Sequence, residues 1–366
     1  MKLLKTADSS LDQSGVLVFS RLRNEISLLP VFFNHYRKLG VSEFIIVDNE
    51  SVDGSFEYLE AQKDVTLYTT DEQYEHSRAG LIWTDYLKDQ HGINRWCLTV
   101  DIDELLVFPF AEHVNLGYLV SYLDHTKSSG IFSLMLDLYP NTIPTTLKLE
   151  TYPEFLQECF YDPNGLFISE SNNHPSLSVY GGVRRRVFME NGKLGRGPVL
   201  KKIPLVKWEN GLGYAASTHS LENSIILADI TSCLLHLKLL NDIEAKAKLT
   251  VAEINTHGVA AKRKRRLKME NAILDKTRDH SSIVLKSEAS KPYNDTFQLI
   301  EDGLLKSSDS FHKFLVSIED QNLGQMVAKL VKEKISRNND EIGIEYSQLL
   351  KIWGSLDFVT KTTFED

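Results

Sequence analysis

Cysteine is scarce in this sequence: Cys97, Cys159 and Cys233 are the only three among 366 residues. Their number is odd, their spacings are long, and no CxxC pair occurs. A disulfide framework or a thiolate zinc site would need more cysteines in tighter patterns. We therefore expect neither, and we expect a protein of a reducing compartment.

Long apolar runs are missing as well. No run approaches the roughly 18 apolar residues that a membrane-spanning helix needs. The opening residues, MKLLKTADSS, lack the apolar centre of a signal peptide. We therefore expect a soluble cytoplasmic protein.

Positive charge is also in short supply, because 41 lysines and arginines face 50 aspartates and glutamates, for a formal net charge of −9. Proteins that coat nucleic acid by neutralising its phosphates are usually basic. The balance excludes a nucleic-acid coat as the main role of this chain. It leaves room for a local basic pocket that binds one small anion.

Short apolar runs alternate with helix signals in the first part of the chain. The runs lie at 16–19, 44–47, 65–68 and 96–100. Such runs are typical of buried parallel strands. Between the first two, apolar residues recur at helical spacing, which predicts a helix over 24–39 with Asn24 as its cap and Gly40 as its stop. The alternation predicts an α/β fold with a doubly wound, mostly parallel sheet and helices on both faces.

The later sequence has a different character. From about 110 to 240 it is irregular and rich in turns, with strand-like runs at 131–136, 186–188, 200–208 and 232–237. Beyond about 240 it becomes charged and helical. We therefore predict one α/β domain over 1–240 and a mainly helical C-terminal region over 241–366.

Charged residues follow several predicted strands directly. Asp101, Asp103 and Glu104 come after the run at 96–100. Carboxylates at positions i and i+2 of an extended segment point to the same side and repel each other unless a cation lies between them. Oxygen-rich sites of this kind suit Mg²⁺ or Mn²⁺. A solvated acidic turn is the alternative, but the apolar runs on both sides favour a metal site.

Two further strand ends carry charge. Arg21 and Arg23 stand where the first strand meets a helix, a place that attracts anions, although ordinary salt bridges at a helix start are equally consistent. Asp48 ends the second strand, where a carboxylate can accept hydrogen bonds from a ribose or a base edge. A capped turn is the alternative there. In a parallel sheet, ligands bind outside the carboxyl ends of the strands, so these residues predict the place of the site.

These segments together resemble the family 2-type glycosyltransferases with the GT-A fold, and most closely a bacterial branch related to family 92. The resemblance covers roughly residues 14–240 and rests on the segments at 23–25, 48–54, 101–104, 181–186 and 235–238. It implies a nucleotide-sugar half at about 14–110 and an acceptor half at 111–240. It also implies transfer of a sugar from a donor such as a UDP- or GDP-sugar to a glycan or lipid-linked acceptor, in bacterial surface polysaccharide or glycoconjugate synthesis. For 276–366 we find no comparable match.

The resemblance assigns roles to individual residues. It implies a Mn²⁺ or Mg²⁺ ion held by Asp101, Asp103 and His236, with His219 as a second candidate ligand. A core histidine is the alternative for His236. The implied donor-binding residues are Arg21, Arg23, Glu25, Asp48, Asp101, Arg184, Arg186 and Lys238.

An inverting transferase, which the resemblance favours, needs a carboxylate that accepts a proton from the acceptor hydroxyl. Asp137 follows an apolar run as a strand-end residue would, so we predict it as this base, with Asp162 and Glu170 as alternatives. The arginines at 184–186 are expected in a strand, where the first and third share a face. They would bind a diphosphate or an anionic acceptor, or form a solvated basic edge.

Between Lys262 and Lys268 the sequence places six cations in seven residues. This run predicts either a solvated helix face or a patch that touches acidic lipid headgroups at the inner face of the plasma membrane.

Two other functions stay open. A nucleotidyltransferase on a similar sheet also uses paired carboxylates and a metal. It usually carries a glycine-rich loop with a lysine after the first strand, where this chain has Ser20 to Arg23. A non-catalytic scaffold that only binds a nucleotide sugar or a glycan is the other alternative.

Overall fold

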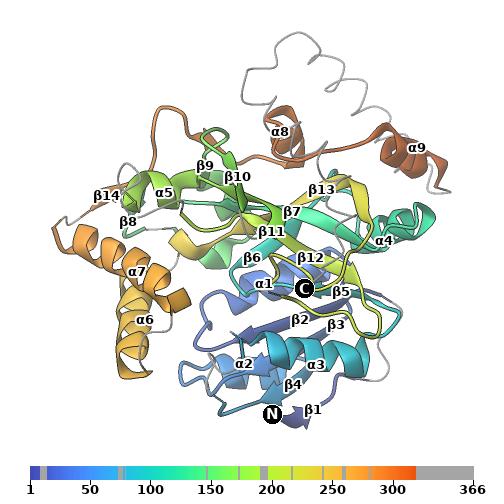
Figure 1. Ribbon diagram of the computed structural model, residues 1–366, viewed down its shortest axis with the longest axis horizontal. Helices are drawn as coiled ribbons and strands as arrows, with labels where there is room; N and C mark the ends of the chain where they lie inside the picture. Colours follow the sequence, from blue (N-terminus) through green and yellow to red (C-terminus); the bar gives the residue numbers. More distant parts are fainter. Residues whose placement is uncertain are drawn as a thin grey trace.

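A nine-stranded mixed sheet forms the centre of the computed structural model (Figure 1), in the order β1-β4-β3-β2-β5-β12-β7-β13-β6. The structure describes residues 1–8, 15–72, 77–78, 80–145, 147–171, 174–189, 197–215, 217–240, 243–257, 261–279 and 282–318. The strands are β1 (Lys2–Lys5), β2 (Leu17–Leu22), β3 (Glu43–Asp48), β4 (Val65–Thr69), β5 (Trp96–Thr99), β6 (Glu104–Val107), β7 (Gly130–Asp137), β12 (Lys201–Lys207) and β13 (Leu227–His236). Strands β2, β3, β4, β5, β7 and β13 run the same way, and β1, β6 and β12 run against them.

Helices cover this sheet, and the predicted α/β class with a large, mostly parallel sheet is confirmed. The helices of the first half are α1 (Leu29–Lys38), α2 (Ser55–Ala61), α3 (Leu81–His91) and α4 (Leu116–His125). Alternate residues of β2 face two separate apolar clusters. Val18 packs in the cluster that includes α1, and Phe19 packs in the cluster that includes α3. The four predicted strands of the first hundred residues coincide with β2, β3, β4 and β5.

The first helix begins later than the sequence predicts. Helix α1 starts at Leu29 with Pro30 in its first turn, the part of a helix where proline fits. Asn24 does not cap it, because Asn24 has a positive φ of 59° and forms part of a loop. The backbone N–H of Asn24 donates to Ser51 Oγ at 2.9 Å, and Asn24 Oδ1 accepts from the backbone N–H of Val52 at 2.8 Å. The loops after β2 and β3 are therefore bonded to each other.

The second half of the sheet supports smaller elements. They are β8 (Thr142–Ile143), β9 (Phe160–Tyr161), β10 (Phe167–Ser171), β11 (His174–Tyr180), α5 (Gly182–Phe188) and the short 3-10 helices η1 (Leu149–Thr151), η2 (Glu154–Glu158) and η4 (Lys238–Leu240). The predicted strands at 131–136, 200–208 and 232–237 lie within or overlap β7, β12 and β13. The predicted strand at 186–188 is wrong, because that segment belongs to helix α5. Gly181 and Gly182 have φ values of 130° and 73°, and they turn the chain from β11 into this helix.

The described residues after β13, up to 318, pack back against the core of the sheet. Helices α6 (Ile243–His257) and α7 (Ala261–Asp279) pack against each other, and α7 also packs against α5 (Figure 1). They are followed by β14 (Ile283–Val284), β15 (Lys291–Pro292), α8 (Thr296–Glu301) and α9 (Asp309–Ser317). Phe297 and Phe311 enter the main core, and their rings contact Phe110. The predicted helical character fits α6 to α9, while the division at residue 240 stays a prediction. None of the described helices is long and apolar enough to cross a membrane.

Candidate functional site

The carboxyl edge of the sheet gathers most of the predicted site residues. Parallel strands β2, β3, β5, β7 and β13 all end there, while the antiparallel strand β12 begins there. The chain goes from β2 to β3 on one side, and β5 lies on the other side of β2. Such a switch in strand order opens a crevice at the carboxyl edge, where α/β proteins bind their ligands.

Four side chains at this edge, those of Asp103, His236, Asp137 and Arg184, form a connected series of polar contacts. His236 ends β13, and the strand register sets it opposite Asp137 in β7 and Glu104 in β6. Its Nδ1 lies 2.6 Å from Asp137 Oδ1, and its Nε2 lies 3.3 Å from Asp103 Oδ2. The other carboxylate oxygen of Asp137 accepts from Arg184 Nε at 2.8 Å. Because Asp137 is an ionised acceptor, it fixes the His236 ring with Nδ1 as the donor and Nε2 directed at Asp103.

The chemistry of this group fits a divalent cation. Asp103, Glu104 and His236 bring one ligand atom each to within 4.8 Å of one another. Glu104 is buried and paired with Lys202, so Asp103 and His236 are the two groups better placed to bind an ion. Carboxylate and imidazole both suit Mn²⁺. A histidine whose second nitrogen is held by a carboxylate is the usual arrangement in metal sites.

Asp101 has a different environment from Asp103. Its Oδ1 lies 3.0 Å from Arg21 Nη1, and its Oδ2 lies 3.5 Å from Lys202 Nζ. The backbone N–H of Asp101 donates to Glu104 Oε2 at 3.2 Å. The negative charge of Asp101 is thus compensated by two cations. Asp101 is therefore less suited than Asp103 to bind a metal directly.

The protonation states follow from these contacts. Burial raises the pKa of Asp103, but the positive charges of His236, Lys246 and Lys238 outweigh it and hold this pKa well below its usual range. Burial also acts to raise the pKa of Asp137, and Arg184 and His236 bring it down to about 2. Both carboxylates therefore remain ionised at neutral pH.

Glu25 shows the opposite behaviour. Burial raises its pKa to about 7 against the opposing effect of Lys246, and the negative charges of Asp103 and Asp101 add to the increase. Lys246 Nζ lies 2.5 Å from Glu25 Oε2. This contact ties helix α6 to the loop after β2, next to the acidic residues of the edge.

Asp48 ends β3 in a buried position. Its Oδ2 accepts from the backbone N–H of Ser51 at 3.1 Å. Its Oδ1 is buried and has no hydrogen-bond partner among the described residues. A buried acceptor without a partner is costly. A ligand that donates to this oxygen would remove that cost.

Three other predicted donor-binding residues, Arg23, Lys238 and Arg186, do not contact the group formed by Asp103, His236, Asp137 and Arg184 in the hydrogen bonds and ion pairs of the described residues. Arg23 is exposed, and Lys238 lies 3.3 Å from Glu270 of α7. Arg186 pairs with Asp162 on a different face of α5 from Arg184. The expected strand alternation of these arginines is wrong, since helical spacing sends their side chains in different directions.

His219 is placed next to the edge but holds no central position. Its Nδ1 lies 2.5 Å from the carbonyl oxygen of Lys201, and burial lowers its pKa to about 4. It is absent from the compact ligand group formed by described residues. The side chain of Glu170 and those of 262–266 and Lys268 lie outside the described residues, so the base alternative and the lipid patch stay predictions.

Two lysines of the site are missing from the sequence prediction. Lys202 reaches the edge because β12 is antiparallel: only its later residues, from Leu205 on, pair with β5, so Lys202 lies beyond the end of that strand, where its Nζ contacts Asp101 and Glu104. Lys246 reaches it from α6, far along the chain. A signal for Lys202 exists in the pair Lys201 and Lys202 before an apolar run, but its use requires knowing the direction of the strand.

Comparisons with known proteins add no assignment: a scan against protein-family models and a search of curated proteins both give no match. The resemblance of the sequence to glycosyltransferases therefore stays a prediction.

Proposed function

We propose that this protein is a glycosyltransferase that transfers a sugar from a nucleotide-sugar donor, a UDP- or GDP-sugar, to a glycan or lipid-linked acceptor with the help of Mn²⁺ or Mg²⁺. The observation that carries the proposal is the chain from Asp103 through His236 and Asp137 to Arg184. It stands at the carboxyl edge of the sheet, beside the switch in strand order. A metal-binding pair in that position suits a diphosphate ligand better than a structural role.

In the donor half, one hydrogen-bond acceptor, a carboxylate oxygen of Asp48, supports this proposal. Asp48 presents a buried carboxylate oxygen without a partner among the described residues. The hydroxyl groups of a ribose or an N–H of a base would satisfy it. Arg21, the next-to-last residue of β2, places its guanidinium beside Asp101 and adds positive charge where a diphosphate would lie.

The metal site needs few protein ligands. Asp103 and His236 would hold the ion, while Asp137 and Arg184 orient the histidine. When bound, the ion would offset the negative charge of the leaving diphosphate. Lys202, Lys238 and Lys246 also surround the acidic residues with positive charge. Arg184 retains a buried Nη2 with no hydrogen-bond partner among the described residues, which is available to a ligand oxygen.

The geometry gives Asp137 the character of a positioning residue. Both of its oxygens are engaged, its side chain is buried, and its pKa is about 2. A general base at neutral pH needs a free oxygen and a pKa nearer to 7. The prediction that Asp137 is the base is therefore not favoured by its surroundings.

The finer features of the proposal depend on the resemblance of the sequence. They are the GT-A fold, inversion at the anomeric carbon, and a role in bacterial surface polysaccharide or glycoconjugate synthesis in the cytoplasm or at the inner face of the plasma membrane. The mixed α/β sheet and its ligand-binding edge support the fold assignment.

A metal-dependent thermal-shift screen tests the proposal. The protein is melted with Mn²⁺ or Mg²⁺ and each of a set of UDP-, GDP-, CMP- and TDP-sugars, since a ligand of the folded state raises the melting temperature. We expect stabilisation by one nucleotide class, only with metal, and none in Asp103→Asn. The matched control Asp275→Asn changes an exposed aspartate of α7 and should behave like the wild type.

The products then separate the alternatives. Sugar transfer releases a nucleoside diphosphate from a UDP-, GDP- or TDP-sugar and CMP from a CMP-sugar. Nucleotidyl transfer from a nucleoside triphosphate to a sugar phosphate releases pyrophosphate, and a scaffold releases none of these products. Absence of any metal-dependent nucleotide response in the wild type would overturn the proposal.

A further inference from the structure

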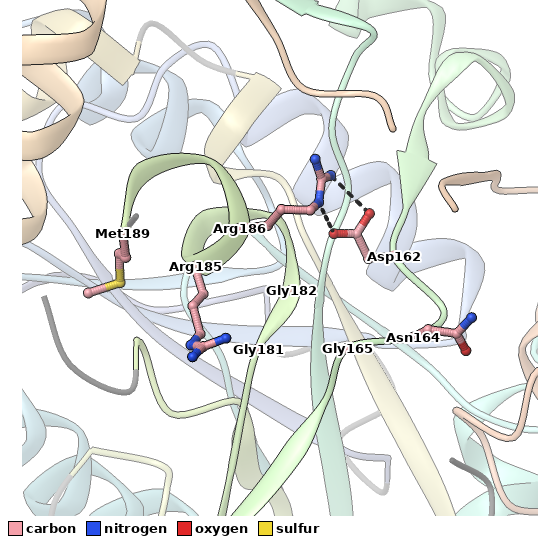
Figure 2. A pocket seen from close by; sticks show the side chains of 8 residues that line it. All are labelled: Asp162, Asn164, Gly165, Gly181, Gly182, Arg185, Arg186 and Met189. Atoms are coloured by element: carbon pink, nitrogen blue, oxygen red, sulfur yellow. Dashed lines mark hydrogen bonds and ion pairs between the residues drawn. The ribbon is translucent and has the colours of Figure 1, made fainter. Parts of the chain in front are cut away.

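A pocket of about 380 Å³ lies between the loop before β10 and helix α5, apart from the group formed by Asp103, His236, Asp137 and Arg184. Figure 2 shows its lining, in which Asp162, Arg185 and Arg186 are the charged side chains. Ligand pockets of proteins commonly measure about 300–1,000 Å³. The pocket is therefore large enough for a small polar molecule such as one sugar unit.

Gly182 connects this pocket with the site. A Cβ atom at Gly182 would lie 3.7 Å from Asp137 Oδ2, so the missing side chain leaves only a short gap between the pocket wall and Asp137. A smaller void lined by Asp137, Asp162 and Gly182 continues from the same place. A molecule in the pocket would thus lie next to the chain of residues that leads to His236 and Asp103.

The wall of the pocket is built from close backbone contacts. A Cβ atom at Gly181 would lie 2.4 Å from the carbonyl oxygen of Gly165, and the φ of Gly181 is 130°. No side chain is tolerated there without movement of the backbone. This contact joins the start of α5 to the segment before β10 and fixes the shape of the pocket.

The two arginines of the pocket have different partners, and Figure 2 shows their side chains diverging. Arg186 forms a two-point ion pair with Asp162, with Nε and Nη2 each 3.0 Å from a carboxylate oxygen. Asp162 is also hydrogen-bonded to the hydroxyl of Tyr139. These contacts neutralise the Asp162 charge with that of Arg186.

Arg185 has no such compensation. Its guanidinium lies over the ring of Phe167, 4.7 Å from the centroid, and the structure shows no carboxylate paired with it within the described ranges. Its Nε is buried and has no hydrogen-bond partner among the residues that the structure describes. The lining residues therefore carry one net positive charge, and Arg185 keeps a buried N–H donor that no described residue uses.

We propose that this pocket binds a negatively charged acceptor sugar and that Arg185 recognises its carboxylate or phosphate. The inference rests on the proposed function for the identity of the occupant as acceptor. Arginine binds both anions with two parallel hydrogen bonds, and the platform of Phe167 holds the guanidinium in place. The neutral pair of Arg186 and Asp162 supplies polar groups for the hydroxyls of the sugar. Such an acceptor would place a hydroxyl group near Gly182, on the side that faces Asp137.

Direct binding in the absence of any nucleotide sugar tests this inference. D-glucuronate, D-glucose 6-phosphate and neutral D-glucose are titrated into the full chain by calorimetry or by protein-observed NMR at low salt. We expect one of the two anions to bind more tightly than glucose, and the preferred one identifies carboxylate or phosphate as the group recognised. Arg185→Gln should weaken that binding by about tenfold or more, the effect of a lost charge-assisted hydrogen bond. Arg185→Lys should retain part of it.

Two controls separate this pocket from the donor site. Arg278→Gln changes an exposed arginine of α7 and should leave the affinity unchanged. Asp103→Asn should abolish metal-dependent nucleotide binding and preserve the binding of the anionic sugar. Loss of nucleotide binding alone thus affects the proposed function and not the pocket. Equal affinity for glucose and both anions, no binding of either anion, or an unchanged affinity in Arg185→Gln would overturn the inference.

Discussion

Asp48 and Asp137 occupy equivalent places, each as the last residue of a parallel strand at the same edge of the sheet, and each is buried. Their partners differ completely. Asp137 has one oxygen bonded to His236 and the other to Arg184. Asp48 has one oxygen bonded to a backbone N–H and the other unpartnered among the described residues. The position of a carboxylate at a strand end therefore predicts the site, while its partners decide its role.

We call Asp137 a filled site, because partners within the protein occupy both of its oxygens, and Asp48 an open site, because one of its oxygens has no partner among the described residues. The charge of Asp137 is already compensated within the protein, so a ligand has little to gain from it. Asp48 retains a buried acceptor whose cost a ligand can remove. The following three predictions test this contrast, beginning with the largest expected effect.

Replacement of Asp137 by asparagine should cause the largest loss of stability. It leaves the buried Arg184 without an anionic partner, and the single amide oxygen can accept from only one of Arg184 and His236. Breaking a buried ion pair on one side typically costs about 3–5 kcal/mol. Urea denaturation followed by tryptophan fluorescence measures the free energy of unfolding.

Asp48→Asn is the matched comparison in that experiment. It keeps an oxygen for the N–H of Ser51 and removes no ion pair among the described residues, so its free energy of unfolding should change by no more than about 1 kcal/mol. Equal losses in the two variants would break the contrast between the filled and the open site.

Glu25 lies between these extremes, since it is largely buried and has one cationic partner, Lys246. Its pKa is about 7 in the folded chain, above the ordinary value of 4.5. Between these two values the folded state binds more protons than the unfolded state, so the free energy of unfolding decreases as pH rises. The stabilising contribution is complete below pH 4.5 and is lost as pH passes 7. We expect a change on the order of 2 kcal/mol over this window.

Denaturation curves measured from pH 4 to 8 check the Glu25 prediction, with Glu25→Gln as the test and Glu57→Gln, an exposed glutamate of α2, as the control. Glu25→Gln should flatten this part of the pH dependence and Glu57→Gln should not. A wild-type and a Glu25→Gln profile that run parallel would show that Glu25 titrates normally.

The sequence predicts several residues of the carboxyl edge because the signal for each of them lies within one short segment. An apolar run followed at once by a carboxylate identifies β3 with Asp48 and β5 with Asp101 and Asp103, and the parallel arrangement then brings the strand ends together. His236 ends the apolar strand β13, but its role as a metal ligand comes from the resemblance and not from this pattern.

The rest of the site depends on contacts between segments far apart in the sequence. Lys202 requires the antiparallel direction of β12, and the pairing of Lys246 with Glu25 spans 221 residues. The environment of Asp137 depends on α5, which two glycines convert from the expected strand into a helix. Residue type and spacing do not contain this information, so the partners that decide the role of each carboxylate appear only in the folded chain.

The third prediction concerns donor binding by Asp48→Asn, and it addresses the open site directly. The amide can keep its oxygen toward the N–H of Ser51, which leaves an NH₂ group where Asp48 has its unpartnered oxygen. A ligand hydroxyl or N–H that donates to this oxygen would then lose its acceptor, and the dissociation constant of the best nucleotide from the thermal screen should rise about tenfold. Calorimetric titration in the presence of Mn²⁺ measures it, with the exposed neighbour Asp71→Asn as control. Asp48→Asn is expected to keep the fold nearly unchanged, so a weaker affinity in this variant, and not in Asp71→Asn, means that the nucleotide contacts Asp48. An unchanged affinity places the nucleotide elsewhere on the edge. It would also remove the distinction between the open carboxylate of Asp48 and the filled one of Asp137.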